Sequence, residues 1–435
     1  MALNLGRLGY DVELFEQLED PRATGGDADA GAGGSGGGGG GRSINLAIST
    51  RGVHALREAD VADTVLANAI PMPGRMIHSP EGTLAFQPYG TRPEHVINAV
   101  SRLGLNINLI DAADALSNVR LYFNQRISDI EPDSASFTAR DAATDESRRV
   151  QVDVIVGADG AFSVVRARLA RLDRFDFSQS YLAHGYKELT IPPVNGGFCM
   201  EKNALHIWPR GGYMMIALPN HDGSFTCTLF WPFEGPNSFA NLQTREEISD
   251  FFSRNFPDAV PHMPELAEEY LHNPTSSLVT VRCGPWYYRN RVVLVGDACH
   301  AVVPFFGQGA NAAFEDCSVL RGCLERHAPD WQAAFAEYYD TRKAHLDVLA
   351  DLCVNNFVEM RDHVASASFR LKKKLEAALH RTFPRWFLPL YSMVAFSRIP
   401  YGDAKAKADR QKTVIMVGML GVIAVAVILG VRIWN

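Results

Sequence analysis

Two short, nearly continuous apolar runs stand out along the chain. Residues 152–157 (Val-Asp-Val-Ile-Val-Gly) and 292–296 (Val-Val-Leu-Val-Gly) each end in glycine and lead into a segment of helical periodicity. Strands that are apolar on both faces are typical of a parallel sheet covered by helices. The two runs therefore predict an α/β domain with a buried parallel sheet.

The pattern changes in the middle of the chain. Between residues 180 and 283, short β-rich pieces at 189–193, 214–219 and 225–230 alternate with Pro, Gly and Asn. This spacing predicts a mostly antiparallel sheet inserted into the α/β domain. From residue 312 to about residue 400 the periodicity is helical.

The first residues follow a helix-then-strand order. Residues 2–8 are typical of the last turns of a helix, and residues 10–15 alternate polar and apolar positions like a strand. No signal peptide is recognisable before them. Residues 24–41 are almost entirely glycine with a few small residues. Glycine loses the most backbone entropy on ordering, so this run predicts a flexible loop.

The C-terminal stretch at residues 413–431 contains no charged side chain. As a helix it would extend roughly 28 Å, close to the thickness of the hydrocarbon layer of a membrane. A buried core helix is the alternative, but such a helix rarely lacks a polar face. We therefore expect a transmembrane anchor, with the preceding domain in the cytosol. Basic and aromatic residues suited to lipid headgroups flank it, namely Lys405, Lys407, Arg410, Lys412, Arg432 and Trp434.

Composition narrows the classes of partner. The chain has 42 Lys and Arg against 49 Asp and Glu, a net charge of -7, so no basic field would attract nucleic acid. Its seven cysteines include no CxxC pair. This argues against a zinc site or a disulfide framework and predicts free thiols.

The longest chemical motif begins at the second apolar run and continues to Asp316. A buried strand places Asp297 at its carboxyl end, where open α/β sheets bind ligands. A carboxylate there can accept hydrogen bonds from sugar or polyol hydroxyls. A Gly-Gln-Gly turn follows at 307–309, and a helix from about Ala310 would direct its N-terminal N–H groups at an anionic ligand. The simpler interpretation is an ordinary capped strand-to-helix turn.

A second motif follows the first apolar run. Residues 157–160 (Gly-Ala-Asp-Gly) end the strand, and Ser163 and Arg166 lie in the helix that follows. His300, within the longer motif, could be interpreted as a general base. We expect it to be a buried structural histidine instead.

Together the two motifs resemble fingerprints of the flavin-dependent aromatic hydroxylases. Other segments resemble, more narrowly, the kynurenine 3-monooxygenase family. The likeness extends from about residue 2 to about residue 430, except for the glycine run. Its further segments are Arg42–Ala47, Arg75–Ser79, Pro88–Thr91, His184–Leu189, His206–Arg210, Pro304–Gly309 and Pro389–Val394.

This resemblance implies an activity and a fold. The family uses FAD, NADPH and O₂ to hydroxylate L-kynurenine at ring position 3, in tryptophan degradation, at the mitochondrial outer membrane. The implied fold is a Rossmann-like FAD-binding α/β domain interrupted by an antiparallel substrate domain. The implied units are residues 1–179 and 284–345 for the FAD-binding domain, 180–283 for the β-sheet substrate domain, 346–402 for a helical region that caps the substrate, and 413–431 for the anchor.

Site residues follow from the resemblance position by position. It implies substrate binding by Arg75, Tyr89, Asn356 and Tyr391. It places Phe305 and Gln308 along the ring site, and it assigns no acid, base or metal ligand, because the cofactor carries the oxygen chemistry. The cofactor residues it implies are Glu16 for the adenosine ribose, Ala47 and Arg102 beside the cofactor, Asp297 for the ribityl and pyrophosphate region, and Ala310 and Asn311 for the flavin pyrimidine.

The sequence departs from the family at its start. The family opens with a strand and a Gly-x-Gly-x-x-Gly loop that lets the FAD pyrophosphate approach a helix. Here that strand and loop do not precede the first helix. We expect either an incomplete sequence or a protein that binds FAD poorly or not at all. Two other functions stay open: hydroxylation of another aromatic acid, and a truncated, membrane-anchored homologue without catalytic activity.

Overall fold

The computed structural model describes residues 1–23, 45–90, 92–363, 375–376, 378–384 and 386–434, with side chains up to residue 418 in the last range. The predicted glycine-rich loop at 24–41 lies outside the described residues.

Both apolar runs form parallel strands. β11 (Ile155–Gly157) pairs in parallel with β18 (Val292–Leu294), as the pattern predicted, and β17 (Tyr287–Tyr288) adds an antiparallel neighbour. β1 (Val12–Phe15) pairs in parallel with β7 (Val119–Tyr122) in a separate two-stranded sheet. The strand predicted near residues 10–15 is thus confirmed. Each carboxyl end that the motifs use belongs to a parallel pair.

Two small antiparallel sheets flank these strands. They consist of β2 (Leu46–Ile48), β6 (Ile97–Val100) and β3 (Ile70–Met72) in one, and β8 (Gln125–Glu131), β9 (Ser136–Asp141) and β10 (Ser147–Gln151) in the other.

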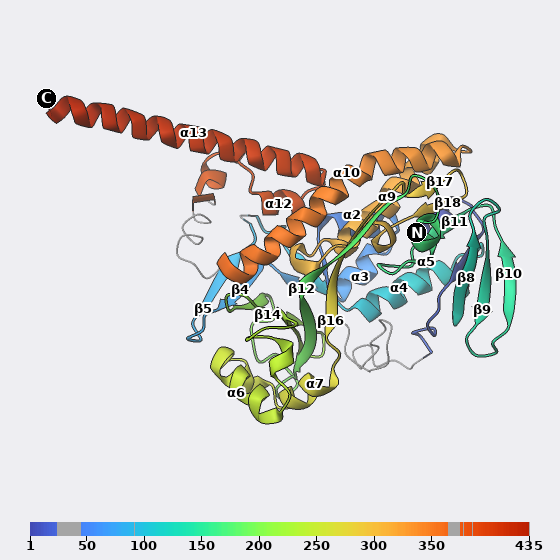
Figure 1. The fold of residues 1–435 in the computed structure, drawn as a ribbon, viewed down its shortest axis with the longest axis horizontal. Helices are drawn as coiled ribbons and strands as arrows, with labels where there is room; N and C mark the ends of the chain where they lie inside the picture. Colours follow the sequence, from blue (N-terminus) through green and yellow to red (C-terminus); the bar gives the residue numbers. More distant parts are fainter. Residues whose placement is uncertain (24–44, 91, 364–374, 377, 385, 435) are drawn as a thin grey trace.

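A seven-stranded sheet dominates the other half of the molecule (Figure 1). Its pairs are antiparallel except β13 with β4, which confirms the predicted type of sheet. β4 and β5 come from a segment that the pattern placed with the FAD-binding domain, because no local periodicity encodes a pairing between residues 130 positions apart. In spatial order the strands are β16 (Ser276–Gly284), β12 (Asp176–Ile191), β15 (Phe225–Pro232), β14 (Met214–Pro219), β13 (Leu205–Pro209), β4 (Gly74–His78) and β5 (Leu84–Pro88).

Helices cover the strands, and the described residues after 312 are mainly helical, as the periodicity from residue 312 to about 400 predicted. The α-helices are α1 (Ala2–Arg7), α2 (Thr50–Glu58), α3 (Ala62–Ala67), α4 (Arg102–Asp114), α5 (Val164–Leu169), α6 (Arg245–Asn255), α7 (Leu266–His272), α8 (Asp297–His300), α9 (Gly309–His327), α10 (Trp331–Val358), α12 (Leu390–Ala395) and α13 (Tyr401–Trp434). Short turns are η1 (Phe239–Asn241), η2 (Val260–His262) and η3 (Pro304–Phe306), and η4 (Glu359–His363) is a π-helix.

The large sheet is buried on both faces. One apolar core joins β18, α9 and α10 to sheet residues such as Ile207 and Phe230. A second core packs Trp208 and Trp231 of the opposite face against α6 and α7. Burial on both faces explains why β15 is apolar at consecutive positions. All seven cysteines are free thiols, as predicted.

The C-terminal helix α13 packs against α10 and α12 at its first turns and then extends away from the rest of the molecule (Figure 1). Among the residues that the structure describes, no helix has the length and apolar character required to span a bilayer. Most of the predicted anchor, from residue 419 onward, lies outside the described side chains.

A buried polar network crosses the β4–β13 pair. Asp258 Oδ2 lies 2.5 Å from His78 Nδ1, and His78 Nε2 lies 2.8 Å from His206 Nδ1. His206 Nε2 donates to the carbonyl oxygen of Glu201 at 2.8 Å. His206 is almost completely buried, and this burial lowers the pKa of His206 to about 4, with a smaller contribution from the adjacent His78.

This lowered pKa makes stability depend on pH. Because the unfolded state takes up a proton near pH 6.5 and folded His206 does not, acid favours unfolding from there down to about pH 4. We expect His206 to account for a loss of about 2 kcal/mol in unfolding free energy between about pH 7 and pH 5. Denaturant titrations at both pH values, on wild type and His206→Asn, measure it. An equal pH loss in the two proteins would contradict the assignment.

Candidate active site

The strand of the longer motif, β18, delivers Asp297 through a turn that requires glycine. Gly296 follows β18 with φ +61 and ψ -140, a conformation that side chains avoid, and a Cβ there would lie 3.1 Å from the Cβ of Ala313. Asp297 begins α8 and is exposed, although protein surrounds it. The surrounding protein raises the pKa of Asp297, while nearby His300 and Arg102 lower it. An accessible carboxylate in this position suits the polyol chain of FAD.

Behind this turn lies a buried ionic network. Asp316 of α9 accepts from the backbone N–H of Gly296 at 3.0 Å, from His300 Nε2 at 2.5 Å and from Arg342 Nε at 2.8 Å. His300 and Arg342 together outweigh burial and lower the pKa of Asp316. His300 is therefore a structural histidine, as expected. Cys299, His300 and Asp316 have the spacing of metal ligands. However, the ring nitrogen of His300 and the carboxylate oxygens of Asp316 already take part in hydrogen bonds within the protein.

The neighbouring carboxylate continues the network. Glu315 accepts from Arg342 and, at 2.5 Å, from Arg51 of α2. Both arginines are almost completely buried. Two cations and two anions thus compensate each other and tie α9 to α2 and α10, which makes the helix that faces the cofactor rigid.

Hydrogen bonds join the second motif to the longer motif. Asp159 accepts from the backbone N–H groups of Val164 and Val165, and Ser163 caps α5. Buried Arg166 donates to the carbonyl oxygens of Ala298 at 2.8 Å and Ala161 at 2.6 Å. The two motifs that lie far apart in the sequence therefore form one rigid unit.

The N-terminus of α9 is positioned by Asn311. Its Oδ1 accepts from the backbone N–H groups of Ser49 (2.8 Å) and Gly52 (3.2 Å), and its Nδ2 donates to Ala47 O and Gly307 O, both at 2.7 Å. All four bonds are internal, so only the backbone N–H of Asn311 is left for a cofactor. The first N–H groups of a helix lack internal partners, so this terminus suits a flavin ring that becomes anionic on reduction.

Three side chains predicted to bind substrate come together from three separate elements. The guanidinium carbon of Arg75 in β4 lies 4.8 Å from the ring centroid of Tyr391 in α12 and 5.3 Å from that of Tyr89. The two tyrosine rings stack at 5.5 Å. Arg75 is buried, and no acidic side chain in the described part of the chain pairs with it. Arg75 Nε and Tyr89 Oη are buried without hydrogen-bond partners.

Aromatic residues adjoin this cluster. Phe305 stacks on Phe357 at 4.2 Å and meets Phe230 edge-on at 4.8 Å. Asn356 donates to the carbonyl oxygen of Phe305 at 2.6 Å, so it fixes this loop as well as bordering the site. Phe306 stacks on Tyr391 at 5.3 Å and joins the aromatic group to the arginine cluster.

Two further predicted cofactor residues lie on different elements. Arg102 begins α4 and is exposed near Asp297. Glu16 directly follows β1, and its carboxylate accepts from the backbone N–H of Leu18 at 2.9 Å. Among the described residues, no hydrogen bond or ion pair joins Glu16 to Asp297.

Sequence reasoning missed the residues that support the site. Arg51, Glu315, Arg342 and Tyr401 are buried polar groups on helices whose patterns resemble ordinary amphipathic faces. The one available signal was the pair of adjacent carboxylates at 315–316 in the first turns of a helix otherwise destined for the core.

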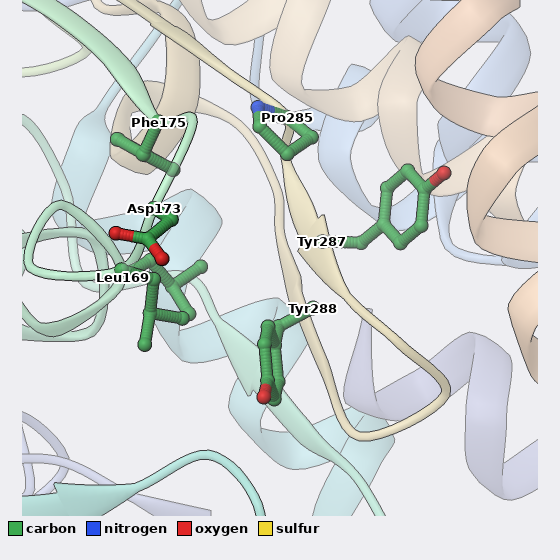
Figure 2. Close-up of a pocket in the computed structure, with 7 residues that line it drawn as sticks. Leu169, Asp173, Phe175, Pro285, Tyr287 and Tyr288 are labelled. Carbon is green, nitrogen blue, oxygen red and sulfur yellow. The ribbon is translucent and has the colours of Figure 1, made fainter.

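A separate hollow lies between the end of α5 and β17 (Figure 2). It is lined by Leu169, Leu172, Asp173, Phe175, Pro285, Tyr287 and Tyr288, none of which is a predicted site residue.

Known proteins share the fold and much of the sequence of this chain. Residues 45–331 match the family described as FAD binding domain. A solved structure of 2-methyl-3-hydroxypyridine-5-carboxylic acid oxygenase has the same fold, with a TM-score of 0.65 and 20% identity over 89% of this chain and 94% of that one. A probable FAD-dependent monooxygenase from Pseudomonas aeruginosa gives a TM-score of 0.65 at 19% identity over 85% and 95%.

Sequence relatives are much more similar. Proteins named kynurenine 3-monooxygenase are 47% identical in Myxococcus xanthus (92% of this chain, 84% of the relative), 44% in Dictyostelium discoideum (93% and 87%) and 40% in Sus scrofa (95% and 85%). Fold and site define an FAD-dependent aromatic hydroxylase. The chain belongs to the kynurenine 3-monooxygenase family.

The buried network predicts that substituting two different aspartates lowers the unfolding free energy by unequal amounts. Asp316→Asn leaves Arg342 and His300 without their shared anion, so we expect the unfolding free energy to fall by about 3–5 kcal/mol. Asp351→Asn breaks the ion pair between Asp351 and Arg282, in which the Asp351 side chain is 65% exposed. This substitution should lower the unfolding free energy by about 1 kcal/mol or less. Denaturant unfolding measures both. Similar costs for the two variants would contradict the role given to the network.

Proposed function

We propose that this chain hydroxylates L-kynurenine at ring position 3, with FAD as cofactor, NADPH as reductant and O₂ as oxidant. Membership of the kynurenine 3-monooxygenase family supports the reaction. The single observation that supports the substrate is Arg75, a buried cation without a carboxylate partner among the described residues.

A buried guanidinium without a counterion is costly, so its retention favours a ligand that supplies the missing charge. The amino-acid carboxylate of kynurenine offers two oxygens to its planar fork. Burial raises the pKa of Tyr89, which keeps its hydroxyl a neutral donor to the same carboxylate. Tyr391 closes the cluster from α12.

The remainder of the kynurenine molecule would extend from its carboxylate at Arg75 towards the aromatic residues of the site. Phe305 and Phe357 offer an apolar wall for the aminobenzene ring and exclude water from it. Asp297, Arg102 and the N-terminus of α9 have the donors and acceptors that hold FAD. Bound FAD would supply the redox chemistry that activates O₂ with electrons from NADPH. The protein's own part is binding, orientation and shielding.

The decisive experiment is product analysis. The FAD-loaded protein receives NADPH, air and L-kynurenine, and chromatography follows 3-hydroxykynurenine against NADPH consumed. Stoichiometric product supports the proposal. Bound FAD and product only from a different aromatic acid would favour the first alternative. Absence of FAD binding at saturating FAD would favour the non-catalytic homologue.

Arg75→Met tests the carboxylate anchor. We expect at least about tenfold weaker kynurenine binding, because charge-assisted hydrogen bonds are lost, with flavin content unchanged. We also expect the ligand-free protein to be equally or more stable, because an unpaired buried charge is removed. Titration of flavin absorbance with kynurenine and thermal unfolding measure the two effects.

The matched control is Arg120→Met, which removes a cation whose side chain is 62% exposed and should leave both properties unchanged. Loss of flavin from Arg75→Met would show that Arg75 serves the cofactor instead.

We further propose that residues 413–431 anchor the protein in a membrane, by family resemblance the mitochondrial outer membrane, with the catalytic part in the cytosol. The described start of this stretch supports the proposal, because Val414, Met416 and Val417 are 54%, 45% and 63% exposed on α13. Lys405, Lys407 and Arg410 precede it at headgroup positions.

Membrane extraction tests the anchor. Val422→Arg combined with Val425→Arg adds two charges near the centre of the stretch, each costing about 2.5–3.5 kcal/mol in the bilayer. We expect the wild type to stay in the pellet after alkaline carbonate washing and the double variant to be released. Phe162→Arg, at a 70% exposed apolar position elsewhere, is the control and should stay in the pellet. Release of the wild type would contradict the anchor.

A further inference from the structure

Tyr401 stands at the junction between the C-terminal helix and the candidate active site. It is the first residue of α13 and is completely buried. Its hydroxyl lies 3.2 Å from Oε1 of Gln308, the residue immediately before α9. The guanidinium carbon of Arg51 lies 4.1 Å from its ring centroid. A residue from the far end of the chain thus reaches the loop that precedes the cofactor-facing helix.

The amide of Gln308 has one satisfactory orientation. Its Nε2 lies 3.2 Å from Ser49 Oγ and 3.3 Å from the carbonyl oxygen of Gly307. A carbonyl oxygen only accepts, so the amide nitrogen must face Gly307 and Oε1 must face Tyr401. The Tyr401 hydroxyl is therefore the donor, and burial raises the pKa of Tyr401, which keeps that proton in place.

Gln308 lies between the two halves of the site. Two residues before it, Phe306 stacks on Tyr391 of the substrate cluster. A Cβ at the preceding Gly307 would come 3.3 Å from the Cβ of Ala47, on the cofactor side. Gln308 is 1% exposed and therefore closely packed. A change in its amide orientation would disturb both the substrate side at Phe306 and the cofactor side at Gly307.

The position of Tyr401 is itself fixed. Arg51, which covers its ring, is paired with Glu315 at 2.5 Å and donates to the carbonyl oxygen of Ile399. The N–H of Gly402 donates to His345 Nδ1 at 3.2 Å. Tyr401 therefore has little freedom to move away from Gln308, and its hydroxyl is held at one point.

We propose that Tyr401 is a positioning residue for the hydroxylation reaction, acting through the side-chain amide of Gln308 at the flavin and substrate site. This inference rests on the proposed function for the site that Gln308 borders. Without the Tyr401 hydroxyl, Oε1 of Gln308 is a buried acceptor without a donor, and the amide loses the contact that fixes it on that side.

The first test is Tyr401→Phe in the full-length, FAD-loaded protein. We expect the ratio of 3-hydroxykynurenine formed to NADPH consumed to fall about threefold to tenfold, the effect of one lost hydrogen bond. The missing product appears as hydrogen peroxide, formed from the same NADPH and O₂. KM for kynurenine should change less than kcat, since Arg75 is untouched. The visible circular dichroism of the bound flavin should also change, with or without turnover.

The matched control is Tyr338→Phe. Tyr338 is also completely buried, in α10, and its hydroxyl has no hydrogen-bond partner in the described structure. Removing that hydroxyl should leave coupling, KM and the flavin spectrum unchanged. A general effect of losing a buried tyrosine hydroxyl would appear in both variants, whereas the proposal requires it in Tyr401→Phe alone.

A double-mutant cycle identifies the route. Gln308→Leu alone should reproduce the flavin dichroism change, and adding Tyr401→Phe to it should have no further effect. Additive effects, or a Tyr401→Phe protein with wild-type coupling and spectrum, would overturn the inference.

The remaining outcomes are also separable. If Tyr401→Phe fails to fold, Gln308→Leu and the control still decide the matter: a dichroism change in Gln308→Leu supports the inference, and none overturns it. If the wild type binds FAD but makes no 3-hydroxykynurenine, the proposed function fails, and the flavin spectra of the variants judge Tyr401 independently.

Discussion

The structure depends on the buried pairing of Glu315 and Asp316 with Arg51 and Arg342. Four charges in the interior would be prohibitively costly one at a time, but they compensate each other and bind further backbone groups. Through them α9 is held against α2, α10 and the turn after β18. The N-terminus of the same α9 suits an anionic flavin ring, so a rigid electrostatic framework stands behind the proposed cofactor site.

Arg75 shows the opposite arrangement. Arg75 is about as buried as Arg342. Two aromatic rings lie beside the Arg75 guanidinium, whereas two carboxylates pair with that of Arg342. The two buried cations therefore differ in their surroundings. The charge of Arg342 is neutralised within the fold, whereas Arg75 has no carboxylate partner among the described residues.

Distant parts of the chain meet at this site because the folding units interpenetrate. β4 crosses from the first third of the chain into the seven-stranded sheet and carries Arg75 there. α12 returns near the C-terminus and places Tyr391 over it, while the loop before α9 links both to the cofactor side. Arg75 and Tyr391 thus come from different elements and Tyr89 from the residue after β5, so this cluster forms only when all of them are packed.

The sequence alone determined the parallel strands around residues 155 and 293, the antiparallel sheet, the helices after residue 312 and the two glycine-aspartate turns, because each leaves a local pattern of apolar spacing and turn residues. It also pointed to Arg75, Tyr89 and Tyr391, through resemblance. Only the tertiary structure decided that β4 joins the large sheet, that Asn311 uses its whole side chain inside the protein, and that Arg51, Arg342 and Tyr401 support α9. Those are pairings between residues tens to hundreds of positions apart. Their energy comes from burial and charge compensation in three dimensions, which no periodicity along the chain records.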